Sequence, residues 1–322
     1  MRVHANDGIA ATAKAALQEE GFKVTTDSIP QEKLADYLNA EKVDVLLVRS
    51  ATKVRKDLID ACAGLKLIGR GGVGLDNIDV KHAEAKGIPV INTPASSSIS
   101  VAELVMAHLF GLMRNLHKAN RRMPGEGLSK FKELKKEYEK GSEVRGKTLA
   151  VVGFGRIGQW TARYALGCGM KVIYVDNHAT AEAIEMEIGG NTVRVPVKMV
   201  TMDEMLAQAD AISLHVPAQK DGRAILGKAE LQRVKPGVVI VNTARGGSVD
   251  EDALLEALKD GRVKGAALDV FVGEPEPRAG LLAQENLSLS PHIGAATAEA
   301  QGRVGDELVD RILSWRSSVT VS

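Results

Sequence analysis

The feature that most constrains the fold of this chain is a short apolar run that ends in three closely spaced glycines. Residues Leu149 to Val152 form the run, and Gly153, Gly155 and Gly158 follow it. A run of this length is typical of a parallel strand covered on both faces. In such a turn the first glycine makes the bend, the second admits a pyrophosphate and the third lets the helix pack on the strand. The pattern predicts a dinucleotide-binding strand, turn and helix.

A second apolar segment supports that prediction and indicates the cofactor. Residues 170–176 form a strand that ends in Asp176, about 20 residues past the glycines, where an acidic side chain accepts from a ribose 2′-hydroxyl. Asn177 and His178 follow, and neither Arg nor Lys stands there to meet a 2′-phosphate. We therefore expect NAD rather than NADP. The alternative at this point is an ordinary strand, turn and helix, because glycine motifs arise by chance in a chain with 32 glycines.

Length, charge and cysteine content narrow the class of protein. The 322 residues suffice for two domains of about 100 to 200 residues each. The net charge of +1 produces no overall field that would attract nucleic acid or an anionic membrane. Cys62 and Cys168 suggest neither a disulfide framework nor a zinc site, and the N-terminus lacks the apolar core of a signal peptide. We expect a soluble cytoplasmic protein with a small-molecule ligand and with no metal, nucleic acid or membrane partner.

Alternating strand-like and helix-like segments predict an α/β protein with two doubly wound parallel sheets. In the first part a helix is expected near 10–20, and strands at 43–48, 65–68 and 89–94, as in a flavodoxin-like domain. Later strands are expected at 148–153, 171–176, near 193, and at 211–215, 237–243, 265–269 and 287–290. We expect a Rossmann NAD-binding domain at 97–292, inserted into a smaller substrate-binding domain made of 1–96 and 293–322.

The segments that join these domains carry helix signals. The serines at 96–100 should cap a long helix that runs to about His117 and crosses between the domains. Residues 121–127, which include Pro124, should break that helical region, and the charged run Lys130 to Lys140 should form a solvated surface. The last helix, at about 295–314, should return to the first domain.

Polar residues stand at the expected strand ends of the second domain, where open α/β sheets bind their ligands. A nicotinamide site needs a proton acceptor and a cation for the substrate carboxylate. His292, of a type whose pKa is about 6.5, and Arg245, with its planar fork, supply these functions. Glu274 is the candidate to orient the imidazole and raise its pKa. Taken alone each residue has a structural interpretation, since His292 can cap a strand and Glu274 can lie in a solvated turn.

The first domain carries a basic, glycine-rich edge. Four glycines lie within residues 69–74, and their backbone amides can form an anion-binding concavity. Arg49, Lys53 and Arg70 would add positive charge around it. The alternative is a tight turn with solvated basic residues.

Seven segments together resemble the D-isomer-specific 2-hydroxyacid dehydrogenase family. They are residues 48–54, 69–77, 92–94, 152–158, 242–247, 265–271 and 291–294, and they follow the family's order along nearly the whole chain. The resemblance implies a catalytic triad of Arg245, Glu274 and His292, in which His292 is the general base in oxidation and the general acid in reduction. Arg245 would hold the substrate carboxylate.

The resemblance also implies the ligand contacts. The cofactor-binding residues would be Gly153, Gly155, Arg156, Ile157, Gly158, Asp176, His215, Val216, Pro217, Thr243, Ala244, Asp269 and Gly294. The substrate-binding residues would be Arg49, Ser50, Arg70, Val73 and Gly74. Within these sets, Arg156 and Ile157 would lie along the pyrophosphate and Asp269 near the nicotinamide, and the amides at 73 and 74 would help to bind the carboxylate.

Arg49, Ser50 and Arg70 resemble the residues with which some family members bind a substrate phosphate. The implied reaction is NAD-dependent oxidation of 3-phospho-D-glycerate to 3-phosphooxypyruvate, the first step of L-serine biosynthesis, in a homodimer formed through the NAD-binding domains. Because the chain ends at Ser322, no C-terminal regulatory domain is expected. One alternative is a glyoxylate, hydroxypyruvate or D-lactate reductase, for which the cation cluster would be superfluous. Another is a non-catalytic NAD-sensing module like a transcriptional corepressor.

Three positions depart from the family's pattern. Ser97 stands where many phosphoglycerate-oxidising members have asparagine, and residues 218–224 lack the threonine usual after the His-Val-Pro turn. The charged run Lys130 to Lys140 also differs. None of these departures affects the triad.

Overall fold

A computed structural model describes residues 1–219 and 221–320; Lys220, within the 218–224 segment considered above, lies outside them. The chain divides into two compact units. Unit 1 consists of Met1–Ser98 and Ala295–Ser322, and unit 2 of Ile99–Gly294. The expected boundaries followed residues 96 and 292. Unit 2 is thus an insertion into unit 1.

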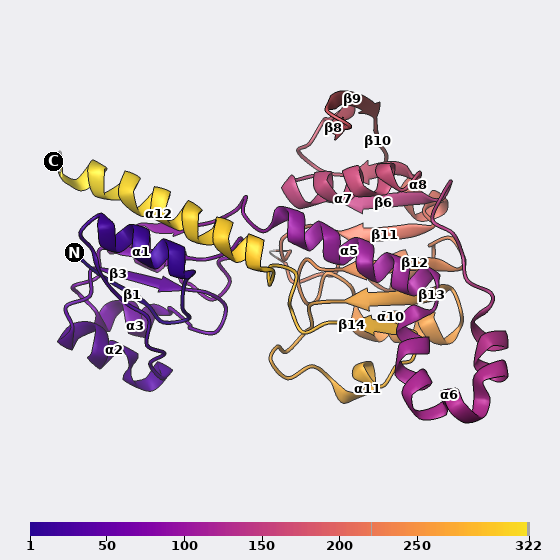
Figure 1. Ribbon diagram of the computed structural model, residues 1–322, viewed down its shortest axis with the longest axis horizontal. Coiled ribbons are helices and arrows are strands. Elements are labelled where there is room, and N and C mark those ends of the chain that lie inside the picture. The colour runs from indigo at the N-terminus through magenta and orange to yellow at the C-terminus, as the bar shows by residue number, and fades with distance from the viewer. Residues whose placement is uncertain (220, 321–322) are drawn as a thin grey trace. The chain divides into compact units, whose positions relative to one another are not determined.

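Figure 1 shows unit 1, with its strands β1 and β3 labelled. The unit is built on a five-stranded parallel sheet in the order β2-β1-β3-β4-β5, the flavodoxin-like order. Its strands are β1 (Arg2–Ala5), β2 (Lys23–Thr25), β3 (Val45–Val48), β4 (Leu67–Arg70) and β5 (Val90–Asn92). Its helices are α1 (Ala11–Glu19), α2 (Gln31–Ala40), α3 (Lys56–Ala61), α4 (Val80–Ala85) and α12 (Ala298–Thr320). The strands predicted at 43–48, 65–68 and 89–94 are confirmed as β3, β4 and β5.

Both faces of this sheet are covered. Alternate residues of β3 enter two different cores, with Leu46 and Val48 on one face and Val45 and Leu47 on the other. The second core also receives the apolar side of α12, whose residues Val304, Leu308 and Ile312 are four positions apart and so share one helix face. This packing explains why β3 is apolar at every position.

Unit 2 contains a seven-stranded parallel sheet in the order β10-β7-β6-β11-β12-β13-β14, a Rossmann order with one further strand. Its strands are β6 (Thr148–Val152), β7 (Lys171–Val175), β8 (Ala183–Ile188), β9 (Asn191–Pro196), β10 (Lys198–Met199), β11 (Ala211–Leu214), β12 (Val238–Asn242), β13 (Val263–Leu268) and β14 (Leu287–Leu289). Its helices are α5 (Ser98–Met113), α6 (Leu116–Tyr138), α7 (Arg156–Gly167), α8 (Met202–Gln208), α9 (Lys228–Leu231), α10 (Glu251–Lys259) and α11 (Ala279–Leu282).

The expectation of a sheet strand near residue 193 was wrong. Strands β8 and β9 instead form an antiparallel hairpin of their own, and the short β10 takes the edge position beside β7. Gly189 and Gly190 connect them, with φ of 57° and 78°, a two-residue turn that suits the twist of a hairpin. Ile184 of β8 is buried in the core of unit 2.

The helical region after β5 also differs from the prediction. Helix α5 ends at Met113 rather than near His117, because Asn115 has a left-handed conformation with φ of 55°. Helix α6 then continues through Pro124, where a break was expected, and its non-helical residue is Lys130.

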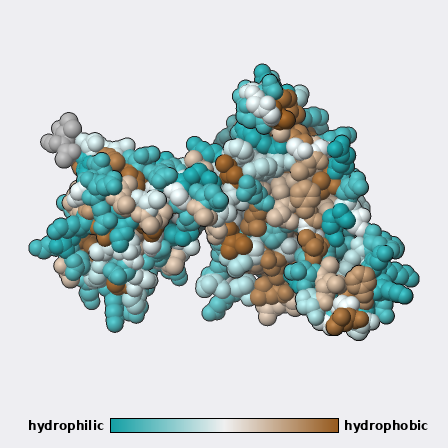
Figure 2. Space-filling model, in the orientation of Figure 1, coloured by the Kyte–Doolittle hydropathy of each residue, from teal (hydrophilic) through white to brown (hydrophobic). Residues whose placement is uncertain are grey.

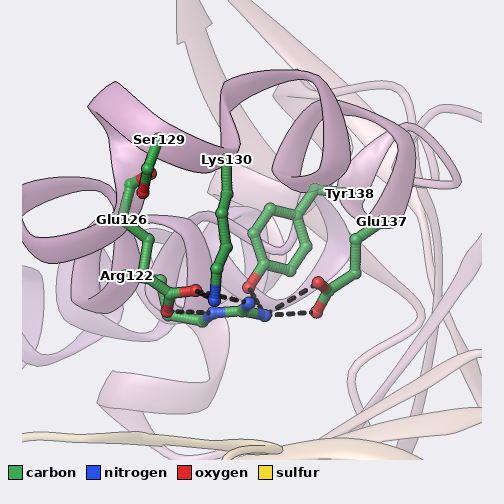
Figure 3. Close-up of polar contacts among 6 residues, drawn as sticks. All are labelled: Arg122, Glu126, Ser129, Lys130, Glu137 and Tyr138. Carbon is green, nitrogen blue, oxygen red and sulfur yellow. Dashed lines mark hydrogen bonds and ion pairs between the residues drawn. The ribbon is translucent and has the colours of Figure 1, made fainter.

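The charged run Lys130 to Lys140 is largely exposed, as expected, and two of its members also take part in an ordered cluster of ion pairs. Beyond the kink the chain folds back, so that Arg122 reaches both halves of α6 (Figure 3). Its Nε lies 2.8 Å from Glu126 Oε1, and its guanidinium also donates to Glu137 at 2.7 Å and to the Tyr138 hydroxyl at 3.2 Å. Lys130 pairs with Glu126. These contacts join residues on both sides of the bend, which single-helix patterns do not reveal.

No single helix in the described parts of the chain is long and apolar enough to cross a membrane. Helices α5 and α6 meet that criterion of length and composition only as a pair, which is bent by 64°. The apolar character of α5 has another cause, since Val105, Leu109 and Leu112 are buried in the core of unit 2.

Candidate active site

The glycine turn of unit 2 has the geometry that dinucleotide binding requires. Gly153 has φ of 91°, and a Cβ there would lie 2.7 Å from the His215 carbonyl oxygen. A Cβ on Gly158 would lie 2.1 Å from the Gly153 carbonyl oxygen, so this position admits only glycine. Around Gly155 no other described atom lies within 4 Å of such a Cβ. Gly155 directly precedes α7, so a pyrophosphate that approaches this open position can reach the backbone N–H groups at the N-terminus of the helix.

Asp176 fixes this turn. Its Oδ2 accepts from the Phe154 N–H at 2.6 Å, and its Oδ1 accepts from the N–H groups of His178 and Ala179 at 2.7 and 2.8 Å. Burial opposes its ionisation, but the three donors outweigh burial and lower the pKa of Asp176. An ionised carboxylate accepts about four hydrogen bonds, so one lone pair is left for a ribose hydroxyl.

Two neighbouring strand ends extend this region. His215 follows β11, and its Nε2 lies 2.8 Å from the Ser213 hydroxyl, while burial lowers the pKa of His215 and keeps the imidazole neutral. Thr243 follows β12, and its buried hydroxyl has no hydrogen-bond partner among the described residues. An unpartnered buried hydroxyl fits a site that a ligand completes. The glycine turn, Asp176 and Thr243 together fit a bound dinucleotide.

The turn after β12 places Arg245. Asn242 holds this turn from both sides, because its Oδ1 accepts from the Ala244 N–H and its Nδ2 donates to the Arg245 carbonyl, each at 3.0 Å. A Cβ on Gly246 would lie 2.0 Å from the Phe271 carbonyl oxygen. Glycine at 246 therefore lets the Arg245 turn pack directly on the segment that leads to Glu274. Sequence reasoning assigned no functional role to Asn242.

Glu274 and His292 form a direct pair. Glu274 Oε2 lies 2.8 Å from His292 Nδ1, and Glu274 Oε1 accepts from the Phe271 N–H at 2.8 Å. Because a carboxylate only accepts, Nδ1 carries the proton of a neutral His292 and Nε2 keeps its lone pair. The His292 side chain is 47% exposed, which leaves this lone pair open to a substrate. The arrangement suits a general base.

A buried carboxylate that the sequence analysis missed supports this pair. Glu251 is 8% exposed and accepts from the Val272 N–H at 2.8 Å, and Arg278 lies 3.3 Å from its other oxygen. These contacts hold both ends of the turn that carries Glu274. The sequence gives little signal for this role, because acidic residues at the start of a helix, as Glu251 is in α10, usually serve its N-terminus.

Asp269 is buried directly after β13 and contacts the loop that carries His292. Its Oδ1 accepts from the Ile293 N–H and its Oδ2 from the Gly294 N–H, both at 2.9 Å. A Cβ on Gly294 would lie 3.2 Å from Asp269 Oδ2, so glycine permits this close approach. The predicted proximity of Asp269 to the nicotinamide stays a prediction.

The predicted substrate residues of unit 1 meet at the carboxyl edge of its sheet. Val48 pairs with Arg70 across β3 and β4, so Arg70 and Arg49, the residue after Val48, both lie at this edge of the sheet. The Arg70 guanidinium lies over the glycine turn, since a Cβ on Gly72 would lie 1.6 Å from one of its nitrogens. Among the described residues, the N–H groups of Val73 and Gly74 have no hydrogen-bond partner. Cations and open amides thus share this edge.

Asp7 fixes the loop that carries Arg49 and Ser50. Its Oδ2 accepts from the N–H groups of Arg49 at 2.6 Å and Thr52 at 3.1 Å, and its Oδ1 accepts from the Thr52 hydroxyl at 2.6 Å. Sequence reasoning missed Asp7. A signal existed, because Asp7 closely follows β1, the strand next to β3, and parallel strands end at the same edge.

Comparison with known proteins identifies the family to which the chain belongs. The NAD-binding-domain model of the D-isomer-specific 2-hydroxyacid dehydrogenases matches residues 106–294. A hydroxypyruvate reductase of Thermotoga maritima is 45% identical over 315 residues, which cover 97% of each chain. The crystal structure of a glyoxylate reductase from Paecilomyes thermophila matches with a TM-score of 0.83 at 30% identity, over 98% of this chain and 94% of that one.

A D-3-phosphoglycerate dehydrogenase of Methanocaldococcus jannaschii is 40% identical over 313 residues. The match covers 97% of this chain but 57% of that protein, so the chain spans little more than half of this relative. The family model lies within unit 2, around the glycine turn, Arg245, Glu274 and His292. The chain belongs to the D-isomer-specific 2-hydroxyacid dehydrogenases, and unit 2 contains their NAD-binding domain.

Proposed function

We propose that this protein is a phosphoglycerate dehydrogenase, which oxidises 3-phospho-D-glycerate to 3-phosphooxypyruvate with NAD. The observation that carries the proposal is that Arg49 and Arg70 both lie at the carboxyl edge of the unit 1 sheet, at the ends of the adjacent strands β3 and β4. Two guanidinium groups beside open backbone amides suit a phosphate. A substrate with an uncharged hydroxymethyl group in place of the phosphate does not require two guanidinium groups for binding.

The reaction removes a hydride from C2 of the substrate and a proton from its hydroxyl group. His292 Nε2 takes this proton, because its Nδ1 is engaged by Glu274. The Glu274 carboxylate then stabilises the imidazolium. Arg245 binds the substrate carboxylate with its planar fork and so orients C2. NAD, held by the glycine turn and Asp176, supplies the hydride acceptor when bound. In the reverse direction the His292 imidazolium returns the proton.

Reduction of hydroxypyruvate is the second candidate function. The observation that favours it is the Thermotoga relative named hydroxypyruvate reductase, which is 45% identical and matches this chain over 97% of both lengths. The phosphoglycerate dehydrogenase relative is less similar and much longer. The two candidates share Arg245, Glu274 and His292 and differ in whether the substrate carries a phosphate.

Initial rates of NADH oxidation with 3-phosphooxypyruvate, hydroxypyruvate, glyoxylate and pyruvate separate the candidates. For the reverse direction, initial rates of NADH formation are measured with 3-phospho-D-glycerate, glycerate and lactate. We expect kcat/KM to be highest for the phosphorylated substrate of each set. A higher kcat/KM for hydroxypyruvate would overturn the proposal in favour of the second candidate. NADH binding without turnover of any of these acids would indicate a sensing module instead.

We also propose that the protein forms a homodimer through unit 2. Helices α5 and α6 expose several large apolar side chains, those of Phe110, Leu116, Met123, Leu128 and Phe131. Figure 2 shows apolar surface in the region of α6. Exposed apolar groups in this number suit a protein interface. Sedimentation equilibrium should give twice the chain mass, and Leu128→Glu with Phe131→Glu should shift it toward the monomer. A monomeric wild-type protein would contradict the proposal.

The cytoplasmic location was expected from the cysteine content and the N-terminal sequence, the place in serine biosynthesis follows from the proposed reaction, and both stay predictions. Complementation of a serine-requiring strain that lacks phosphoglycerate dehydrogenase tests the second of them. Growth without serine is the expected result, and the His292→Ala variant should fail to support it.

A further inference from the structure

A buried histidine on α5 is linked by hydrogen bonds to the loop that carries His292. His108 lies in the interior of unit 2, with an exposed fraction of 7%. Its Nε2 is 2.9 Å from the Ser290 hydroxyl, and Ser290 donates to Asp269 Oδ1 at 2.6 Å. Its Nδ1 is 2.8 Å from the hydroxyl of Ser288 in β14. The proton-transfer chemistry does not use any of these side chains directly.

The direction of these hydrogen bonds follows from the number of protons. The Ser290 hydroxyl has one hydrogen, which it donates to the Asp269 carboxylate, so it must accept from His108. His108 therefore carries a proton on Nε2. Burial lowers the pKa of His108 and favours the neutral imidazole, whose Nδ1 then accepts from Ser288. The result is a directed chain from His108 through Ser290 to Asp269.

Asp269, held by this chain of hydrogen bonds, in turn restrains the backbone directly after His292. Its two oxygens accept from the N–H groups of Ile293 and Gly294. His292 itself has φ of 55°, a left-handed conformation that costs a non-glycine residue about 1 kcal/mol or more. Such a conformation persists only where its surroundings hold it. The two residues that directly follow His292 are the ones bonded to Asp269, and these hydrogen bonds supply that restraint.

We propose that His108 and Ser290 are positioning residues for the dehydrogenase reaction. They hold the Asp269 carboxylate, which holds residues 293 and 294, and this fixes the His292 imidazole for proton transfer. The inference rests on the proposed role of His292. It assigns functions to a helix residue and a serine that no family motif named above includes.

Ser288 offers a matched control, because its hydroxyl also bonds His108 but lies outside the path from His108 to Asp269. In Ser290→Ala we expect kcat to fall by about 10- to 100-fold, since small displacements of a catalytic group have effects of that size. The dissociation constant for NADH should change by less than about twofold. In Ser288→Ala kcat should stay within about twofold of wild type. Ser290→Thr, which keeps the hydroxyl, should restore most of kcat.

Equal losses of kcat in the two alanine variants would overturn the inference, as would full kcat in Ser290→Ala or a failure of Ser290→Thr to recover activity. Should Ser290→Ala not fold, His108 provides the test. His108→Gln retains a donor and an acceptor, whereas His108→Leu has neither, so the glutamine variant should have the higher kcat. Equal kcat in both would exclude His108 from the positioning chain.

A readout without turnover separates this inference from the proposed function. Diethyl pyrocarbonate modifies accessible imidazoles, and mass spectrometry gives the rate at His292. We expect this rate to change by about threefold or more in Ser290→Ala, because the loop loses a restraint, and to be unchanged in Ser288→Ala. Unchanged rates in both would overturn the inference. An inactive wild-type protein with the expected modification rates would instead overturn the proposed substrates and leave the positioning chain intact.

Discussion

The ligand edges of units 1 and 2 use the same local device and differ in how firmly it is held. In each unit a carboxylate shortly after a strand accepts backbone N–H groups from a functional loop, through Asp7 in unit 1 and Asp269 in unit 2. Asp269 is 1% exposed and is held in turn by Ser290. Asp7 is partly exposed to solvent.

This difference matches the chemistry proposed for each edge. Proton transfer by His292 depends on a narrow range of distances, so its loop benefits from a buried, fully paired support. Arg49 and Arg70 provide charge through long side chains, which tolerate small movements of the backbone. We therefore expect changes in unit 2 to lower kcat, and changes in unit 1 to raise KM. Four measurements test this contrast, and a fifth concerns the stability of both units; they follow in order of decreasing effect.

The largest effect is expected from His292→Ala. Loss of the general base should lower kcat by about 10² to 10⁴. The dissociation constant for NADH, measured by fluorescence titration, should stay near the wild-type value because the glycine turn is untouched. Loss of NADH binding, or turnover at the wild-type rate, would contradict the assignment.

Glu274→Gln should lower kcat by about 10², with a smaller change in KM. The amide group that replaces Oε2 donates to Nδ1 and favours the tautomer with the proton on Nε2, which cannot act as a base. Glu276→Gln, an exposed neighbour in the same turn, is the control. Similar rates for both variants would show that the pair between Glu274 and His292 does not orient the base.

Arg70→Ala should raise KM for the phosphorylated substrate by about 10- to 100-fold, the value of a lost charge-assisted hydrogen bond. KM for hydroxypyruvate should change by less than about threefold. Lys66→Ala, just before the opposite end of β4, is the control for loss of a positive charge. Equal changes for both substrates would remove Arg70 from the phosphate site.

Asp7→Asn should raise KM by about three- to tenfold and leave kcat within about twofold, because the Arg49 loop loses acceptors and shifts slightly. Asp44→Asn is the matched control. Asp44 also accepts a backbone N–H in unit 1, from Arg2 at 2.8 Å, but lies away from the ligand edge. A fall in kcat without a change in KM would break the contrast between the units.

The smallest effect concerns stability against pH. Burial lowers the pKa of His4 in unit 1 and of His108, His117 and His215 in unit 2, from an unfolded value of 6.5. Below that value the unfolded chain binds more protons than the folded one, so stability is lost as the pH falls. Melting temperatures at constant ionic strength should fall by a few degrees between pH 7.5 and 5.5. A constant or rising melting temperature would contradict this linkage.

Local sequence determined the elements that lie within one segment. Alternating apolar runs and turn residues identified strands β3, β6, β7, β11 and β12, because a strand covered on both faces must be apolar throughout. The glycine turn was equally evident, since Gly153 and Gly158 stand where no side chain fits. The family motifs predicted the roles of Arg245, Glu274 and His292 and the use of NAD, because such motifs consist of residue types in a fixed order, which the sequence shows directly.

Tertiary structure decided the features that depend on partners far apart in the chain. The bend in α6 requires Glu137 and Tyr138 to return to Arg122. The support of the His292 loop requires His108 to meet Ser290 across 182 positions. Asp7 holds a loop 42 positions away. Periodicity and motifs describe neighbours along the chain, whereas a buried polar group is defined by the donors and acceptors that folding brings to it. Residue types thus predicted the reacting groups, and only the packed fold showed which contacts hold them in place.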